Sequence, residues 1–319
     1  SAVGLVEVVR SLRFFLDTMD DVVEQAKELR PDVIVLIDSP DFNLRIAPRL
    51  KALNIPIVYY VSPQLWAWRE GRVEQIRKYV DRMLVIFPFE VDFYAKHGIE
   101  ARFVGHPLLD IIDHEQINKR AEALRHGFKI PDSKRVVGLF PGSRRAEVTR
   151  LMPRMLDAAR VITERRDDVL FLVGCSPWFN PERYKKAIAE HEDLPLRAIH
   201  GRSYEVMALS DFSMICSGTA TVEAAVVGTP FLCTYRMAWA SALLAQLMVN
   251  YEHACMVNIL AGKQVIPELL QHQAEPLTMG LIALESMETG APQMRQELAE
   301  VVETLGGKGA SRRAAEQAL

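Results

Sequence analysis

Short apolar runs alternate with helix-length amphipathic segments along most of the chain. The apolar runs lie at 33–37, 57–61, 83–87 and 102–104, and then at 136–140, 169–173, 196–199, 212–216 and 230–234. Helical periodicity occupies 43–53, 71–79, 147–165, 181–191, 204–209, 221–227 and 276–319, with interruptions at 290–292 and 306–307. Buried strands that alternate with helices are typical of parallel sheets covered on both faces. The pattern therefore predicts an α/β fold.

The apolar runs fall into two blocks, separated by a charged and weakly periodic region near 108–135. Two such blocks predict two doubly wound, Rossmann-like parallel-sheet domains with a cleft between them. We expect residues 1–120 to form the first domain, 121–290 the second, and 291–319 C-terminal helices that cross back to the first. A doubly wound domain ordinarily opens with a strand and a Gly-rich turn, and neither precedes Val33. We therefore expect this strand and turn to be missing from a sequence that begins with Ser1 and not Met.

Composition and charge narrow the classes of function. A formal net charge of −3 gives no general attraction to nucleic acid, so any basic site must be local. The 4 cysteines are not spaced as zinc ligands and are too few for a disulfide framework, which favours reduced thiols in the cytoplasm. The sequence also lacks a run of about 18 apolar residues, so it predicts no membrane-spanning helix.

Two turns in the second block are candidate phosphate sites. In the first, a strand ends at Phe140, a Pro-Gly-Ser turn follows, and a helix begins near Arg144. A helix N-terminus presents free N–H groups to an anion, and an arginine can form two parallel hydrogen bonds to phosphate oxygens. The alternative is an ordinary helix capped by Ser143, with Glu147 in its first turn and a solvated arginine.

The second turn follows the strand that ends at Cys216. The sequence CSGTATVEAA has a small-residue turn, three hydroxyls and an acid that could accept hydrogen bonds from a ribose diol. It matches neither the GxGxxG fingerprint nor the P-loop. Both turns are expected at carboxyl ends of parallel strands, where open α/β sheets bind ligands. The alternative is a turn that only allows tight packing of a helix on the sheet.

The stretch VIVLIDSPDFN in the first block places two acids after a strand. Asp38 directly follows the apolar run and Asp41 comes three residues later. An acid in this position suits a general base, whereas a structural acid would cap the next helix or bond turn N–H groups. A pair of carboxylates about 5–9.5 Å apart would also be compatible with glycoside hydrolysis.

Three further features have both a functional and a structural interpretation. Trp66 and Trp68 follow the second strand and could stack on a sugar, touch acyl chains or belong to the core. His106 closes the last strand of the first block and could bind substrate, act as a base or support a turn. The amphipathic segment 3–16, with Arg10 and Arg13, could lie on an anionic membrane surface or face the core.

The motifs taken together resemble the lipid-A-disaccharide synthase family. IDSPDFN, YYVSPQLWAWR, GHP, FPGSRRAEV, CSGTATVEAAVVGTP and VNILAG occur in the family's order, from about residue 3 to 275. The family's N-terminal turn of the GEASGD type is absent. The resemblance implies a two-domain GT-B glycosyltransferase that needs no metal or other cofactor. It also implies that UDP-2,3-diacylglucosamine is joined to 2,3-diacylglucosamine 1-phosphate (lipid X), with inversion, to give the β-1,6-linked disaccharide 1-phosphate and UDP.

The resemblance assigns roles to particular residues. Asp41 matches the family's general base and Arg144 its essential arginine, so both are expected to be catalytic. UDP-sugar binding is expected of Gly142, Ser143, Ser217, Gly218, Thr219, Ala220, Thr221, Glu223 and Asn258. Acceptor binding is expected of Asn43, Ser62, Trp66 and His106, and contact with the membrane of Val8, Val9, Leu12 and Phe15. Asp38 is expected only to support the turn. The enzyme would be a peripheral protein on the cytoplasmic face of the inner membrane of a Gram-negative bacterium, and the resemblance leaves room for a homodimer.

Two other interpretations remain open from the sequence. Another GT-B sugar-nucleotide enzyme, a UDP-N-acetylglucosamine 2-epimerase or a MurG-like transferase, would share the nucleotide end but not the acyl-binding face. A non-catalytic, membrane-associated sugar-nucleotide binding protein would bind UDP without transferring sugar.

Overall fold

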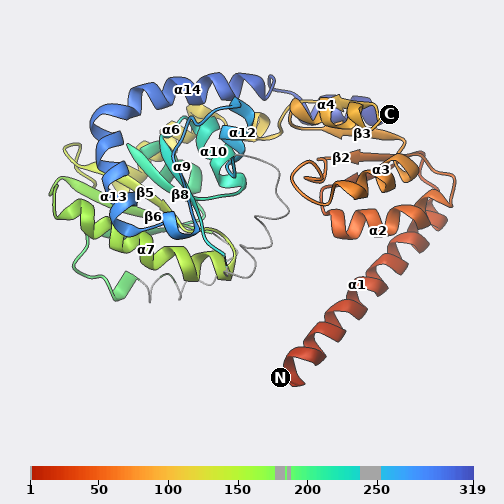
Figure 1. Cartoon of the computed structure of the whole chain (residues 1–319), viewed down its shortest axis with the longest axis horizontal. Helices are drawn as coiled ribbons and strands as arrows, with labels where there is room; N and C mark the ends of the chain where they lie inside the picture. Colours follow the sequence, from red (N-terminus) through yellow and green to blue (C-terminus); the bar gives the residue numbers. More distant parts are fainter. Residues whose placement is uncertain (1, 177–183, 185–187, 238–252) are drawn as a thin grey trace. The chain divides into compact units, whose positions relative to one another are not determined.

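The structure, a computed structural model, describes residues 2–176, 184, 188–237 and 253–319, with side chains from residue 13 onward. Within these residues the chain divides into two compact units, and Figure 1 shows the helices and strands of each. The first unit comprises Ser1–Pro107 and Gly306–Leu319, and the second comprises Leu108–Leu305.

These bounds differ from the expected divisions after residues 120 and 290. Helix α6 (His114–Gly127) belongs to the second unit because Ala121 and Leu124 pack into the core of that unit. Helix α14 (Ala291–Thr304) also belongs there, since Leu298 is fully buried in the same core. From the C-terminal region, only the segment from Gly306 onward, with helix α15 (Ala310–Ala318), belongs to the first unit.

The described part of the first unit has a parallel sheet in the order β1-β2-β3-β4. Its strands are β1 (Ile34–Ile37), β2 (Ile57–Tyr60), β3 (Arg82–Val85) and β4 (Ala101–Phe103). Its other helices are α1 (Ala2–Leu29), α2 (Pro40–Lys51), the 3₁₀ turn η1 (Glu70–Arg72), α3 (Val73–Tyr79) and α4 (Phe89–Lys96). Helices α1 to α4 pack on one face of the sheet, and α15 packs on the other face through Ala314, against Val58 and Leu84.

The apolar run 33–37 predicts a strand that is buried on both faces, but β1 is buried on only one. Leu36 faces the core, but Val35 is 41% and Ile37 57% exposed. Strand β1 lies at the edge of the described sheet, and the cluster that α15 joins includes Val33, just before β1, but no residue of β1 itself. The edge position therefore leaves one face of β1 exposed.

The described part of the second unit has a parallel sheet in the order β10-β9-β8-β5-β6-β7. Its strands are β5 (Arg135–Phe140), β6 (Val169–Cys175), β7 (Leu196–His200), β8 (Phe212–Cys216), β9 (Phe231–Tyr235) and β10 (Glu268–Leu270). Its helices include α5 (Leu108–Ile111), α6, α7 (Arg145–Thr163), α9 (Ser203–Leu209), α10 (Thr219–Val227), α12 (Met256–Ala261), α13 (Pro276–Glu285) and α14. Since the chain moves outward from β5 in one direction and from β8 in the other, the strand order reverses between these two neighbours. Ligands of open α/β sheets bind at such a reversal.

The predicted α/β class and parallel sheets are confirmed, and the predicted strands lie within two residues of the observed ones. The apolar pattern missed β10, α4, α6 and α12, which are short or dominated by charged residues. Most of the predicted helix 181–191 lies outside the described residues. The expected interruption near 290–292 is observed as a π-helical turn (Ser286–Gly290) between α13 and α14, and Pro292 lies in the first turn of α14, where its missing N–H is tolerated.

Candidate functional site

The loop from β1 to α2 places Asp41 at the exposed start of a helix. Asp38 and Ser39 both have left-handed backbone conformations, with φ of 47° and 40°. Such conformations are unfavourable for residues other than glycine and persist when their surroundings hold them. Here the Asn43 amide donates to the carbonyls of Ile37 at 3.0 Å and Asp38 at 2.7 Å, and the buried Tyr59 hydroxyl donates to the Asp38 carbonyl at 2.5 Å.

Asp38 supports this turn through its backbone carbonyl and not through its carboxylate. Among the described residues, the exposed Asp38 carboxylate makes no hydrogen bond or ion pair. The two acids of the opening motif therefore occupy different environments, because Asp41 is surrounded by arginines.

Arg72 and Arg69 both contact the Asp41 carboxylate. The Arg72 Nη2 donates to Oδ1 at 2.8 Å, and the Arg69 Nη1 lies 3.5 Å from the same oxygen. The Arg72 hydrogen bond and the positive charges of Arg72, Arg69 and Arg45 outweigh desolvation, and they lower the pKa of Asp41 below its ordinary 3.8. No role was expected of these arginines, although Arg69 and Arg72 stand in the WAWREGR stretch after the second strand.

The structure buries all four residues that were expected to bind the acceptor. Their exposed fractions are 7% for Asn43, 6% for Ser62, 8% for Trp66 and 4% for His106. The Ser62 hydroxyl bonds the Pro63 carbonyl and the Tyr94 hydroxyl, both at 2.9 Å. Burial lowers the pKa of His106 to about 4, so its imidazole is neutral at physiological pH. Of the four, only Asn43 has contacts in the Asp41 loop, while Trp68, which is 43% exposed, presents an accessible ring.

Glu90 lies beneath the loop that carries the two tryptophans. Its carboxylate is 1% exposed and accepts hydrogen bonds from the Trp66 Nε1 at 3.3 Å and the Phe87 N–H at 3.1 Å. Burial is the largest cause of a rise in the pKa of Glu90 to about 7. No role was expected of Glu90, because FPFEV is also compatible with a solvated first-turn glutamate.

The two predicted phosphate turns lie side by side in the second unit. The turn at 141–144 follows β5, and the turn at 217–218 follows β8, the neighbouring parallel strand. The two turns therefore flank the reversal of strand order. Sequence periodicity located both strands, but only the sheet order shows that their carboxyl ends adjoin.

Glu147 occupies the N–H groups that the first turn was expected to offer to phosphate. Its Oε2 accepts from the backbone N–H groups of Ser143 at 3.2 Å and Arg144 at 3.1 Å. Glu147 thus reaches back to the backbone N–H of Arg144, the N-cap residue of α7, and the alternative cap by Ser143 is not formed. Gly142 has a φ of 108°, and a Cβ there would lie 2.7 Å from the Glu147 Cβ, so this turn requires glycine. The Arg144 side chain remains 81% exposed.

The N-terminus of α10 is the better anion site. No side chain among the described residues caps this helix, and Gly218, Thr219 and Ser143 are exposed beside it while Ala220 is half-buried. The Ser217 hydroxyl donates to the Ala254 carbonyl at 3.2 Å, and the buried Thr221 hydroxyl donates to the Gly218 carbonyl at 2.7 Å. These two hydroxyls hold the turn. The N–H groups of Ser217 and Thr221 donate to the carbonyls of Thr234 and Gly218, so the N–H groups at Gly218 and Thr219 are the ones that face a ligand at this helix start.

Asn258 and Glu223 are engaged within the protein. The fully buried Asn258 amide donates to the Ile266 carbonyl and to Glu268, and its oxygen accepts from the N–H groups of Val265 and Ile266. All the hydrogen-bonding capacity that the amide nitrogen and oxygen ordinarily use is therefore occupied, and Asn258 positions the start of α12. The Glu223 carboxylate accepts from the Tyr204 hydroxyl at 3.1 Å, and burial raises its pKa.

Helix α1 has apolar side chains on more than one face. Phe14 is 74% and Leu16 47% exposed, while Phe15 packs edge-on against Phe42 with ring centroids 5.3 Å apart. The expected membrane-facing residues Val8, Val9 and Leu12 lie outside the residues whose side chains are described. No helix in the described part of the chain has the length and apolarity needed to cross a membrane.

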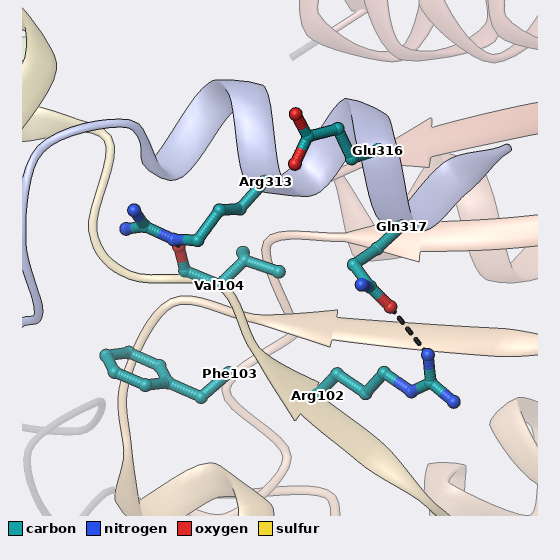
Figure 2. A pocket seen from close by; sticks show the side chains of 6 residues that line it. All are labelled: Arg102, Phe103, Val104, Arg313, Glu316 and Gln317. Atoms are coloured by element: carbon teal, nitrogen blue, oxygen red, sulfur yellow. Dashed lines mark hydrogen bonds between the residues drawn. The ribbon is translucent and has the colours of Figure 1, made fainter.

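A cavity of about 260 Å³ lies between β4 and α15, and no residue of the Asp41 loop lines it. Figure 2 shows its lining of Arg102, Phe103, Val104, Arg313, Glu316 and Gln317. The Arg313 guanidinium donates to the carbonyls of Val104, Gly307 and Lys308, at 2.7–2.9 Å. Since these bonds occupy all three guanidinium nitrogens, Arg313 fastens the C-terminal segment to the first sheet. Among the described residues, no group of three or more His, Cys, Asp or Glu side chains could hold a metal ion.

Comparison with known proteins decides the family. The family model described as lipid-A-disaccharide synthetase matches residues 1–319. The chain belongs to the lipid-A-disaccharide synthetase family. The lipid-A-disaccharide synthase of Syntrophus aciditrophicus is 40% identical over 321 residues, covering 100% of this chain and 83% of the relative. That of Myxococcus xanthus is 38% identical over 321 residues, with the same coverage. Family membership confirms the resemblance found in the motifs.

Solved structures show the same fold at low sequence identity. The UDP-N-acetylglucosamine 2-epimerase of Neisseria meningitidis bound to UDP-GlcNAc matches with a TM-score of 0.63 and 12% identity. The matched region covers 95% of this chain and 80% of the epimerase chain. A putative UDP-N-acetylglucosamine 2-epimerase from Listeria monocytogenes has a TM-score of 0.63 and 14% identity, with coverage of 92% and 74%. The two parallel-sheet domains are therefore of the GT-B type shared by this family and these enzymes.

Proposed function

We propose that the protein is a lipid-A-disaccharide synthase that joins UDP-2,3-diacylglucosamine to 2,3-diacylglucosamine 1-phosphate. The observation that carries this proposal is the match of the family model over residues 1–319, together with relatives of that name at about 40% identity. The reaction forms a β-1,6 glycosidic bond, breaks the C1–O bond to UDP, and inverts the anomeric centre.

The second unit supplies the donor site in this proposal. The pyrophosphate rests on the N–H groups at the start of α10, around Gly218 and Thr219, and the exposed Arg144 approaches it from the turn after β5. Negative charge builds on UDP as the C1–O bond breaks. Preorganised N–H groups and an arginine stabilise that charge, each donor contributing up to about 3–4 kcal/mol by comparison with oxyanion-hole groups. Ser143 and Gly142 shape the Arg144 turn, and their neighbour Glu147 fixes it.

The first unit supplies the base. Asp41 takes the proton of the acceptor's 6-hydroxyl as that oxygen attacks C1, a contribution of about 10²–10⁴-fold in rate. The low pKa of Asp41 keeps this carboxylate ionised throughout the neutral range. The buried Asn43 holds the turn from which Asp41 projects.

Both substrates carry acyl chains, so the protein would work at a membrane surface. We propose a peripheral position on the cytoplasmic face of the inner membrane, with α1 as the contact. The exposed Phe14 and Leu16, with Arg13 beside them, supply the apolar and basic groups that an anionic surface attracts.

A transfer assay with the two diacyl substrates tests the proposal. We expect formation of the disaccharide phosphate and UDP, and no turnover of UDP-N-acetylglucosamine in an epimerase assay. Turnover of the non-acylated nucleotide without transfer from the diacyl donor would support an epimerase or MurG-like enzyme instead. Binding of UDP with no turnover of either substrate would support a non-catalytic binding protein.

A further inference from the structure

Two arginine side chains contact the single carboxylate of Asp41. Arg72 and Arg69 share the Asp41 Oδ1, and Arg45 adds a third positive charge to its electrostatic surroundings. Glu70, which lies between Arg69 and Arg72 in sequence, contacts the His97 Nε2 at 3.0 Å and forms no ion pair with either arginine among the described residues. Asp38 has no ion pair with a described residue. The site thus has the electrostatics of a binding place for a further anion.

The arginines are not needed to ionise Asp41. A carboxylate with the ordinary pKa of 3.8 is already ionised at neutral pH. By lowering that pKa, Arg72 and Arg69 reduce the affinity of Asp41 for a proton, which weakens a general base. The arginines therefore weaken Asp41 as a base in the free protein. Their presence is explained if a group of the substrate binds them during the reaction.

The backbone holds Arg69 in a conformation that serves such contact. Arg69 has a left-handed φ of 60°, and its guanidinium lies over the Trp68 ring, 4.3 Å from the centroid. Stacking on the ring face leaves the N–H groups at the edge of the guanidinium plane directed outward. The side chains of Arg69 and Arg72 are 42% and 26% exposed, so a ligand can reach both.

We propose that Arg69 and Arg72 form the subsite for the phosphate group of the acceptor sugar. This inference rests on the proposed function, which supplies an acceptor with a phosphate at C1. The phosphate offers several oxygens to the two guanidinium groups, and it displaces them in part from Asp41. The freed carboxylate then accepts the proton of the acceptor hydroxyl. The subsite would make the protein select a phosphorylated acceptor over the same diacyl sugar without phosphate.

The test compares these two acceptors in neutral detergent micelles, so that no anionic lipid headgroup competes for the arginines. The proteins are the full chain and its variants Arg69→Gln and Arg72→Gln. Arg77→Gln is the matched control, because Arg77 also lies 2.8 Å from a carboxylate, Glu74, but away from Asp41. Affinity for UDP and the unfolding midpoint show that each variant is folded.

We expect the wild type to prefer the phosphorylated acceptor. Each Gln variant should lose about 10- to 100-fold in kcat/KM for this acceptor, mainly through KM, since a hydrogen bond to a charged group is removed. Toward the acceptor without phosphate the same variants should keep or exceed the wild-type kcat/KM, because Asp41 loses a neighbouring arginine that weakens it as a base. Arg77→Gln should behave as the wild type with both acceptors. Equal losses with both acceptors, or a wild type with no preference, would overturn the inference.

A second measurement needs no variant. With the phosphorylated acceptor, the acid limb of kcat should lie at higher pH than that of kcat/KM, because kcat reports Asp41 after the phosphate has engaged its arginines. When the acceptor lacks phosphate, the acid limbs of kcat and kcat/KM should lie at the same pH. If they lie at the same pH with the phosphorylated acceptor as well, phosphate does not displace the arginines from Asp41. Absence of transfer with either acceptor would instead contradict the proposed function on which the inference rests.

Discussion

At the scale of single residues, a change of Arg144 should affect UDP binding without affecting the free energy of unfolding. Its side chain is 81% exposed, and its contact with Glu147 is a long 3.4 Å ion pair. An exposed pair of this kind contributes little to folding. We predict that Arg144→Ala weakens UDP binding and lowers kcat/KM, each by about 10- to 100-fold, because a charge-assisted contact to phosphate is lost. Titration calorimetry with UDP and a transfer assay measure the two effects.

The neighbouring Arg145→Ala is the control for this variant, since Arg145 is also an exposed arginine of the same segment. Both variants should keep the free energy of unfolding within about 0.5 kcal/mol of the wild type. If Arg144→Ala binds UDP as tightly as Arg145→Ala does, the donor site has been placed incorrectly.

At the scale of elements, Glu90 links α4 to the loop after β2, and we predict a pH-dependent stability from it. Its pKa is raised from 4.5 to about 7 in the folded protein, so the folded state binds more protons than the unfolded state between these values. The contribution of Glu90 to the free energy of unfolding therefore falls as pH rises from about 4.5 through 7, by up to ~3 kcal/mol. His106 has the opposite effect on stability. Its pKa is lowered from 6.5 to about 4, so its contribution to the free energy of unfolding rises as pH increases from about 4 to 6.5.

The variant Glu90→Gln isolates the first of these effects. Glutamine keeps an acceptor for only one of the Trp66 and Phe87 N–H groups and cannot ionise, so the lost hydrogen bond adds a cost that does not depend on pH. Chemical denaturation at several pH values should show the variant gaining stability relative to the wild type as pH rises through 7. Glu100→Gln, which changes an exposed acid on the same unit, should show no such trend. A constant difference between Glu90→Gln and the wild type from pH 4.5 to 8 would contradict the assignment.

The sequence predicted the elements better than the chemistry between them. Parallel strands and their helices follow from local apolar periodicity, so β5, β8 and the turns after them were located correctly. The partners of the polar groups depend on contacts between distant segments, which periodicity does not contain. Trp66 was expected to face the acceptor but is buried over Glu90, whereas Arg72 and Arg69 come from another segment to meet Asp41. Asn258 was expected near UDP, and its buried hydrogen bonds with 265–268 depend on β10, which was not predicted.

At the scale of the whole molecule, we predict that α1 attaches the protein to anionic membranes. The double variant Phe14→Ser, Leu16→Ser should bind vesicles of anionic phospholipid about 10-fold more weakly, because two exposed apolar side chains are lost. Its free energy of unfolding should be unchanged. Phe15→Ser is the contrasting variant, since Phe15 packs on Phe42 and its loss should cost about 1–3 kcal/mol of stability.

Co-sedimentation with anionic and neutral vesicles measures this association. If the double variant binds anionic vesicles as the wild type does, α1 is not the membrane contact.

The central claim is that the protein transfers a diacyl sugar with Asp41 as the base. It is tested most directly by the rate of disaccharide formation from UDP-2,3-diacylglucosamine and 2,3-diacylglucosamine 1-phosphate, measured for the wild type and Asp41→Asn with UDP affinity as the control. We expect Asp41→Asn to keep the UDP affinity of the wild type and to lose about 10²–10⁴-fold in turnover. Transfer by Asp41→Asn at near the wild-type rate would contradict this claim.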